Sequence, residues 1–167
     1  MKIIGLLAAI ASALIIFCGT QFTASMNAAN STSLASPAPF PTPEDPQPVY
    51  TSYKGVTVGM SQADARAKLG DSSQRSNSGD FYTISNNESV QVLYDKAQKV
   101  KSITVNYSGS LKMAPSTKDV LGEDVKKEAD GSIYKLVRYP SAGFWVSYNR
   151  TAGGDATIII TMQVIPK

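Results

Sequence analysis

The chain after residue 55 contains one pattern written twice. Residues 61–70 hold a Ser-x-x-Asp sequence followed by Leu-Gly, and residues 116–122 hold the same elements with a shorter spacing. In each copy short segments of alternating polar and apolar residues follow: 81–84, 89–95 and 100–107 in the first, and 133–139, 143–149 and 156–163 in the second. The polar segments 71–76 and 123–128 are predicted weak edge strands. An internal repeat constrains architecture before any single residue does, so we expect two copies of one unit.

Each copy begins with signals for a short helix. A serine three residues before an acid is typical of an N-terminal capping box, and Gly70 and Gly122 are suited to end the two helices in a left-handed conformation. Period-two alternation in the later segments indicates half-buried antiparallel strands. The predicted fold class is therefore α+β, with two tandem helix plus antiparallel-strand repeats (residues 53–112 and 113–167) and the helices packed on one face of the sheet.

The first 25 residues predict export. Lys2 precedes an uncharged, mostly apolar run, Ile3–Gly19, which is the layout of a secretory signal. Three fates remain open: cleavage near residues 23–25, retention as a membrane anchor, or lipidation at Cys18. Residues 26–52 are rich in Pro, Ser and Asn and predict an extended spacer. We therefore expect the periplasmic or extracellular face of a cell envelope, with membrane contact through the N-terminal segment if it is uncleaved.

Composition argues against most catalytic chemistry. The chain has no His and one Cys, so the sequence lacks the parts of a Cys/His metal site and of a Cys–His or Ser–His catalytic pair. Its net charge is +3 and the signs are interspersed, whereas a nucleic-acid surface needs clustered basic residues. The carboxylates in residues 123–130 do not have the spacing of a calcium loop. We expect a non-enzymatic protein with no cofactor and no nucleic-acid partner.

Residues 55–107 also carry an ordered set of short motifs. Gly-Met-Ser at 59–61 and Leu-Gly at 69–70 precede Val-Leu-Tyr-Asp at 92–95 and Val-Lys-Ser-Ile at 100–103. This order resembles the superfamily that joins the SmpA/OmlA outer-membrane assembly lipoproteins with the β-lactamase inhibitor proteins. The tandem form is more similar to the inhibitor proteins, although their disulfide-forming cysteines are absent here. The resemblance implies non-covalent recognition by an open sheet surface.

Alternation along the strands places Trp145 on the sheet face opposite the helices. The same count assigns to that face Lys135, Val137, Ser147, Ile159 and Thr161 of the second copy, and Leu93, Thr83, Gln91, Ser102 and Thr104 of the first. A Trp surrounded by Lys, Ser and Thr has the composition of a protein-binding hot spot. Two alternatives remain: Trp145 packs between the units, or a bulge reverses the faces of its strand.

The predicted function is that of an exported envelope protein, a scaffold or accessory module that binds another envelope or extracellular protein through the open sheet face. Trp145, Lys135, Val137, Ser147, Ile159 and Leu93 are the predicted binding residues. The alternatives are a secreted enzyme inhibitor similar to the β-lactamase inhibitor proteins and a module that binds a cell-wall polymer.

Overall fold

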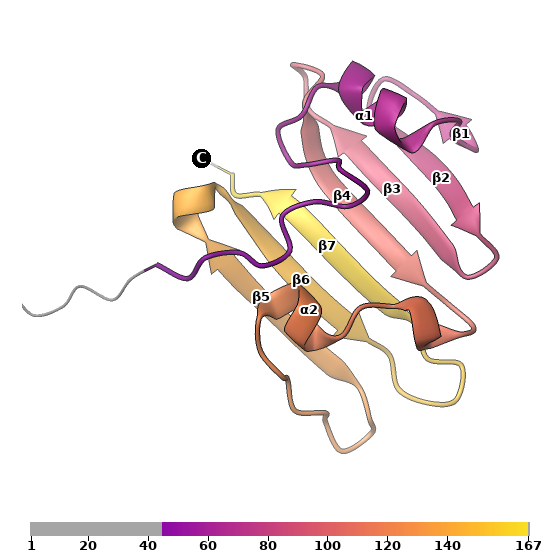
Figure 1. The fold of residues 1–167 in the computed structure, drawn as a ribbon, viewed down its shortest axis with the longest axis vertical. Coiled ribbons are helices and arrows are strands. Elements are labelled where there is room, and N and C mark those ends of the chain that lie inside the picture. The colour runs from indigo at the N-terminus through magenta and orange to yellow at the C-terminus, as the bar shows by residue number, and fades with distance from the viewer. Residues whose placement is uncertain (1–44, 167) are drawn as a thin grey trace, which may run out of the picture. The chain divides into compact units, whose positions relative to one another are not determined.

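The computed structural model describes residues 45–166, which belong to one compact unit (Figure 1). The predicted leader, including Cys18, and the first part of the spacer lie outside the described residues. The elements, in chain order, are α1 (Gln62–Leu69), β1 (Gln74–Arg75), β2 (Gly79–Ser85), β3 (Glu88–Tyr94), β4 (Val100–Tyr107), a 3-10 turn η1 (Leu111–Met113), α2 (Thr117–Leu121), β5 (Ile133–Tyr139), a second 3-10 turn η2 (Pro140–Ala142), β6 (Phe144–Arg150) and β7 (Ile158–Val164). Within residues 45–166 no helix has the length and apolar composition needed to cross a bilayer.

Both helices start at the predicted serine caps. The Ser61 hydroxyl accepts a hydrogen bond from the Asp64 amide at 3.1 Å. Ser116 forms a complete capping box, because its hydroxyl accepts from the Asp119 amide and its own amide donates to the Asp119 carboxylate. The helices remain short, at eight and five residues. Gly122 ends α2 with a φ of +78°, a conformation that a residue with a side chain rarely adopts.

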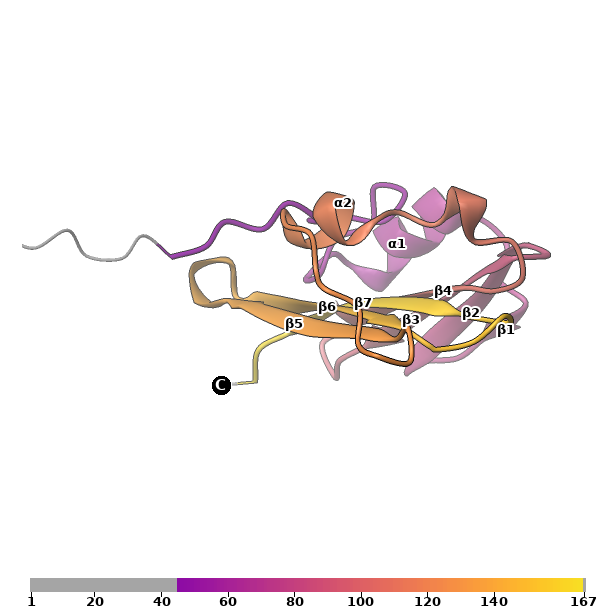
Figure 2. The ribbon, with the colours of Figure 1, turned by 90° about the horizontal axis from the view of Figure 1, so that it is seen from below.

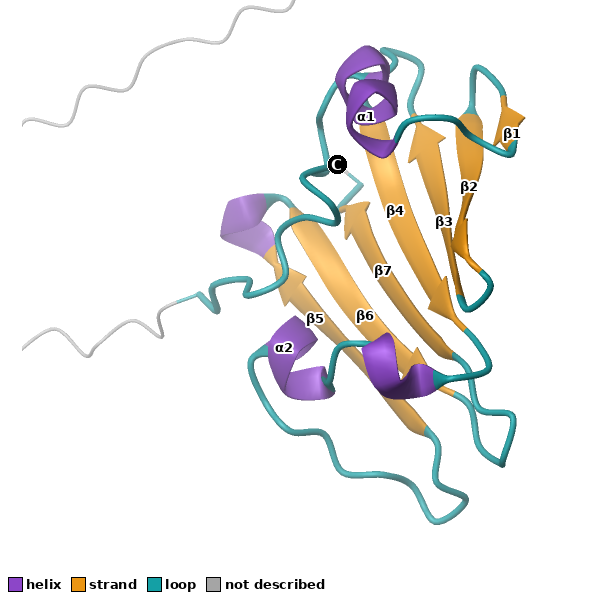
Figure 3. Ribbon diagram, turned by 45° about the vertical axis from the view of Figure 1, so that its right-hand side comes forward, coloured by secondary structure: helices purple, strands orange, loops and turns teal. Residues whose placement is uncertain are grey.

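All seven strands belong to one antiparallel sheet with the order β1-β2-β3-β4-β7-β6-β5 (Figure 3). The two halves of the chain join where β4 pairs with β7, from Ser102 opposite Gln163 to Tyr107 opposite Ile158. The predicted architecture of two helix-plus-strand repeats is therefore wrong. The protein is mostly one continuous sheet with two short helices.

The physical reason for this difference lies in strand pairing. Alternation shows that a segment is a strand with one buried face, but it carries no information on which strands are neighbours. The two halves are also unequal. Residues 71–76 provide the two-residue strand β1, whereas the predicted edge strand at residues 123–128 does not form.

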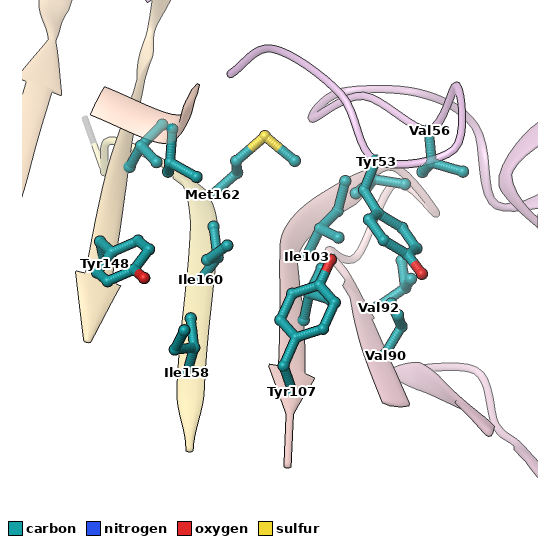
Figure 4. Packing of buried hydrophobic residues seen from close by; sticks show 14 of the residues in the cluster. Tyr53, Val56, Val90, Val92, Ile103, Tyr107, Tyr148, Ile158, Ile160 and Met162 are labelled. Carbon is teal, nitrogen blue, oxygen red and sulfur yellow. The ribbon is translucent and has the colours of Figure 1, made fainter. Parts of the chain in front are cut away.

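The core lies between the sheet and the layer that contains the helices. Figure 2 shows α1, α2 and the segment leading to α1 over the same face of the sheet. Side chains of alternate strand positions fill this space, and Figure 4 shows members of β3, β4, β6 and β7 with Tyr53 and Val56 of the N-terminal segment. Ile103, Val105 and Ile160 are fully buried at the junction of the two halves. Each such side chain stabilises the fold by about 1.5–3 kcal/mol relative to an exposed position.

A buried carboxylate ties α1 to the sheet. Asp80 of β2 has a fully buried side chain and forms an ion pair with Arg66 of α1, whose side chain is 24 % exposed. The phenol groups of Tyr82 and Tyr94 also donate to the Asp80 carboxylate, at 3.3 and 2.8 Å. Burial raises the pKa of the Asp80 carboxyl, but these hydrogen bonds and the positive charge outweigh it and the net pKa is lowered. The carboxylate thus stays ionised inside the fold.

The N-terminal segment is attached by a second polar contact. The Tyr53 hydroxyl donates to the Glu88 carboxylate at 2.7 Å, at the start of β3. The pKa of the neighbouring Tyr50 is raised to about 12, mainly by burial and secondly by the negative charge of Glu88. The last part of the predicted spacer, from Asp45, is therefore packed against the domain, and the Ser141 hydroxyl donates to the Asp45 carboxylate at 2.5 Å.

Candidate binding surface on the open sheet face

The face of the sheet opposite the helices is built from rows of side chains that run across the strands. Directly paired residues of antiparallel strands project from the same face, so the register defines each row. The rows are Arg138, Trp145, Gln163, Ser102 and Leu93; then Leu136, Ser147, Thr161, Thr104, Gln91 and Phe81; then Tyr134, Asn149, Ile159, Asn106, Ser89 and Thr83. We call these residues the open face.

The structure places four of the six predicted binding residues on the open face. Trp145 and Ser147 project from β6, Ile159 from β7 and Leu93 from β3, all in the three rows and all half-buried. The further predicted positions Thr83, Gln91, Ser102, Thr104 and Thr161 lie in the same rows. The register brings Trp145 next to Gln163 and Arg138. Neither alternative position of Trp145, between separate units or on a reversed strand, is found.

Lys135 and Val137 were wrongly assigned to this face. Lys135 pairs with Tyr148 on the helix side, and its ammonium group lies 2.7 Å from the Glu123 carboxylate. Val137 pairs with Val146 and packs against the core. The reason is that β5, with the sequence Ile-Tyr-Lys-Leu-Val-Arg-Tyr, has apolar residues at both odd and even positions. Its alternation is therefore ambiguous, and only the pairing with β6 determines which of its residues face the core.

The open face is nearly free of charge. Among the residues of the three rows Arg138 is the only charged side chain, and the rest are apolar, aromatic, hydroxyl or amide residues. Charged residues are depleted in the centres of protein interfaces, whereas Arg and aromatic residues are enriched there. A solvent-facing sheet surface of an ordinary domain carries Lys, Glu and Asp among its polar residues, so this composition is a distinctive property of the face.

Apolar side chains lie at both sides of the open face. At the β5 and β6 side Tyr134 is 67 % exposed and Leu136 38 % exposed, and Trp145 lies on the same side of the face in the row of Arg138. At the β2 side Phe81 is 36 % exposed. The middle strands present mostly polar residues together with Ile159, Ser102 is buried, and the hydroxyls of Thr104 and Thr161 lie 3.2 Å apart across the β4–β7 junction. The surface thus offers two apolar margins around a centre that is mostly polar.

A pocket opens at one end of the open face, beside Arg138. Its volume is about 560 Å³, and its other lining residues are Pro140, Gly143, Val164, Ile165 and Pro166. It is formed where the turn between β5 and β6 approaches the chain that follows β7, and the Ile165 amide donates to the Gly143 carbonyl at 3.0 Å. The lining is almost entirely apolar apart from the arginine.

The carboxylates near the start of β5 do not form a metal site. Glu123 is paired with Lys135, and the carboxylate of Asp130 accepts hydrogen bonds from the amide and hydroxyl of Ser132. In the described part of the chain no cluster of three acidic or cysteine side chains could hold a metal ion.

Sequence reasoning missed the exposed side chains that β5 contributes to the open face. Tyr134, Leu136 and Arg138 lie on the open face because β5 has the opposite phase to the one expected, and the buried Ile133 and Tyr139 at its two ends were the available signal. Phe81 was within a predicted strand and was not singled out.

Comparison of the chain with protein-family models, with curated proteins and with solved structures found no significant match. The resemblance of residues 55–107 to the outer-membrane assembly lipoproteins and the β-lactamase inhibitor proteins therefore stays a prediction.

Proposed function

We propose that the protein is a non-enzymatic recognition module of the cell envelope, and that another envelope or extracellular protein binds its open face. The single observation that carries this proposal is the composition of that face. Trp145, Leu136 and Tyr134 occupy three successive rows of β5 and β6, on a face whose only charged side chain among the residues of the rows is Arg138. Such a surface loses little on dehydration, because few charges have to leave water, and it gains from the burial of aromatic area.

The rigidity of the platform favours binding. The strands β4 and β7 in the middle of the face are hydrogen-bonded on both sides, and their far side chains are packed in the core. A partner that covers the face therefore orders few backbone groups, and the entropy cost of association is correspondingly small. We expect Trp145 to supply the largest share of the binding energy, because Trp is among the residue types that dominate binding energy in protein interfaces.

The position of the spacer is compatible with this role. The first described residues, from Asp45 to α1, lie on the helix side of the sheet (Figure 2). A leader that exports or anchors the chain, followed by a Pro-rich spacer, would present the domain at a distance from a membrane. This part of the proposal rests on the sequence of residues 1–44 alone.

The test is affinity capture from envelope and culture-medium extracts with the tagged full chain as bait. The Trp145→Ala variant is compared with Met113→Ala, because Met113 is 85 % exposed and lies outside the open face. We expect a protein that is held by the parent and by Met113→Ala and lost by Trp145→Ala, with urea unfolding unchanged in both variants. Retention of every captured protein by a folded Trp145→Ala variant would show that the open face is not the binding surface.

A further inference from the structure

The pocket beside Arg138 combines one cation with apolar walls. Val164, Ile165 and two prolines surround a volume of about 560 Å³, within the size range of small-ligand sites. Figure 1 shows that the turn between β5 and β6 and the chain after β7 lie at the same end of the sheet. The pocket therefore lies between these two segments, at the margin of the open face that carries Arg138.

Arg138 is available to a ligand. The ion pairs among residues 45–166 are Arg66–Asp80 and Lys135–Glu123, so Arg138 has no acidic partner in this part of the chain. Its side chain is exposed, and it lies directly opposite Trp145 in the register. A guanidinium group always carries its charge and matches the two oxygens of a carboxylate with parallel N–H donors.

The apolar walls define the rest of the ligand. A carboxylate without an apolar group gains no apolar burial in this pocket. A carboxylate attached to an apolar group buries that group against Val164, Ile165 and the prolines. The surrounding open face offers no other charge, so a charged group of a partner is compensated at Arg138 and nowhere else on the face. Charge complementarity at one point fixes the orientation of a complex.

We propose that this pocket binds the C-terminal residue of a partner polypeptide, with its carboxylate on Arg138 and its apolar side chain against Val164, Ile165 and Pro166. A C-terminal residue carries both groups on one Cα, which suits a single compact pocket. An internal acidic residue next to an apolar one on an extended segment would direct the two side chains to opposite sides. That the polypeptide belongs to the partner of the open face rests on the function proposed above.

The test uses small probes and the isotope-labelled full chain in mild detergent, followed by nuclear magnetic resonance. N-acetyl-leucine represents the C-terminal residue, N-acetyl-leucinamide lacks the charge, and acetyl-Glu-Leu-amide has the same groups in an internal arrangement. We expect saturable shifts of the Arg138 side chain and of Val164 and Ile165 with N-acetyl-leucine, and at least tenfold weaker binding of the other two probes.

Two variants locate the binding energy. Arg138→Gln should weaken N-acetyl-leucine at least tenfold, whereas Arg75→Gln, an exposed arginine on β1, should leave it unchanged. Equal binding of the leucinamide, or no effect of Arg138→Gln in a folded protein, would overturn the carboxylate assignment. Equal binding of acetyl-Glu-Leu-amide would overturn the C-terminal assignment, and the absence of saturable shifts would overturn the site.

The outcome is separate from that of the capture experiment. Binding of N-acetyl-leucine without any captured protein would support the pocket and contradict the proposed function. A captured protein lost by Trp145→Ala, together with no probe binding, would support the function of the open face and refute the pocket.

Discussion

The carboxylate of Asp80 accepts two hydrogen bonds from the guanidinium of Arg66, at 2.8 Å from Nε and 3.0 Å from the second nitrogen. The same guanidinium donates to the Ser76 carbonyl at 2.8 Å, just before β2. One arginine thus joins the helix, the turn and the sheet. Because α1 buries only Ala65 completely, this polar contact carries much of the attachment of the helix.

We predict that Asp80→Asn lowers the free energy of unfolding by about 2 kcal/mol at neutral pH. The variant leaves a guanidinium without its counter-charge and weakens the bonds from Tyr82 and Tyr94, and breaking one member of a buried pair is costly. The measurement is urea unfolding followed by circular dichroism. Glu123→Gln breaks the ion pair with Lys135, in which the Glu123 side chain is 51 % exposed. It should change the free energy of unfolding by less than about 1 kcal/mol. Equal effects would contradict the assigned role of Asp80.

The same carboxylate predicts a dependence on acid. Its folded pKa is lowered, so its contribution to stability is fully present above the unfolded value of about 4 and is lost as pH falls further. The difference in unfolding free energy between the parent and Asp80→Asn should therefore shrink as pH falls from about 5 towards 2. Asp119 and Asp130 also have lowered pKa values, but they are present in both proteins and cancel in the difference. A constant difference would show that Asp80 acts through shape and not charge.

At alkaline pH the free energy of unfolding should fall, because buried tyrosines that attach the N-terminal segment to the sheet become ionised. Burial and the Glu88 charge raise the pKa of Tyr50 to about 12, and burial also raises the pKa values of Tyr53 and Tyr107. The pKa of a tyrosine in the unfolded chain is about 10. These phenols therefore stabilise the fold below about pH 10, and their contribution to the free energy of unfolding is lost as pH rises towards about 12. Ultraviolet titration of tyrosinate, with circular dichroism, checks this expectation.

The variant Glu88→Gln provides the comparison for that titration. Removing the negative charge should lower the pKa values of Tyr50 and Tyr53, so tyrosinate should appear at a lower pH than in the parent while the protein is still folded. Identical titration curves would mean that burial alone protects these phenols.

The continuous sheet predicts one cooperative unit. Ile160 of β7 is fully buried at the junction of the two halves, and Ile160→Ala should cost about 3 kcal/mol. Ile159→Ala removes the same atoms from the half-buried open face of the same strand and should cost about 1 kcal/mol. Amide hydrogen exchange should show β3 and β6 losing protection together in Ile160→Ala. Selective loss in one half would indicate two separate units.

Trp145 provides an internal reporter, because the chain has one Trp. We predict that iodide quenches its fluorescence in the free protein, since the side chain lies half-exposed on the open face. A partner that binds this face should reduce the quenching constant several-fold, whereas a partner of the helix side should leave it unchanged. A fully protected Trp in the free protein would contradict the half-buried position. The Met113→Ala variant should behave as the parent does.

Local features were predictable from the sequence, and pairing was not. The serine caps, Gly122 and the alternating segments located both helices and six strands, because capping and period-two burial depend on neighbouring residues. The union of the halves depends on contacts between Ser102–Tyr107 and Ile158–Gln163, far apart in the chain, which no local pattern encodes. The strands could therefore be predicted from the sequence, whereas their order in a single sheet could not.

The candidate site was predictable in part for the same reason. In β6 the buried Val146 and Tyr148 establish the phase clearly, so Trp145 and Ser147 were assigned to the correct face. In β5 apolar residues occupy both phases, so Lys135 and Val137 were misplaced. Asp80 escaped notice because Ser-Gly-Asp at residues 78–80 is typical of a turn, and only the approach of Arg66 explains a buried acid at that position.

The last strand of the described chain, β7, lies inside the sheet and not at its edge. Its pairing with β4 closes a loop of about fifty residues between Tyr107 and Ile158, a connection that is slow to form because chain entropy must be lost before contacts are gained. Without β7, β4 and β6 would each present an unpaired edge, and unpaired edges promote aggregation. A chain that ends before residue 158 would keep those edges, so we expect it to aggregate more readily than the full chain.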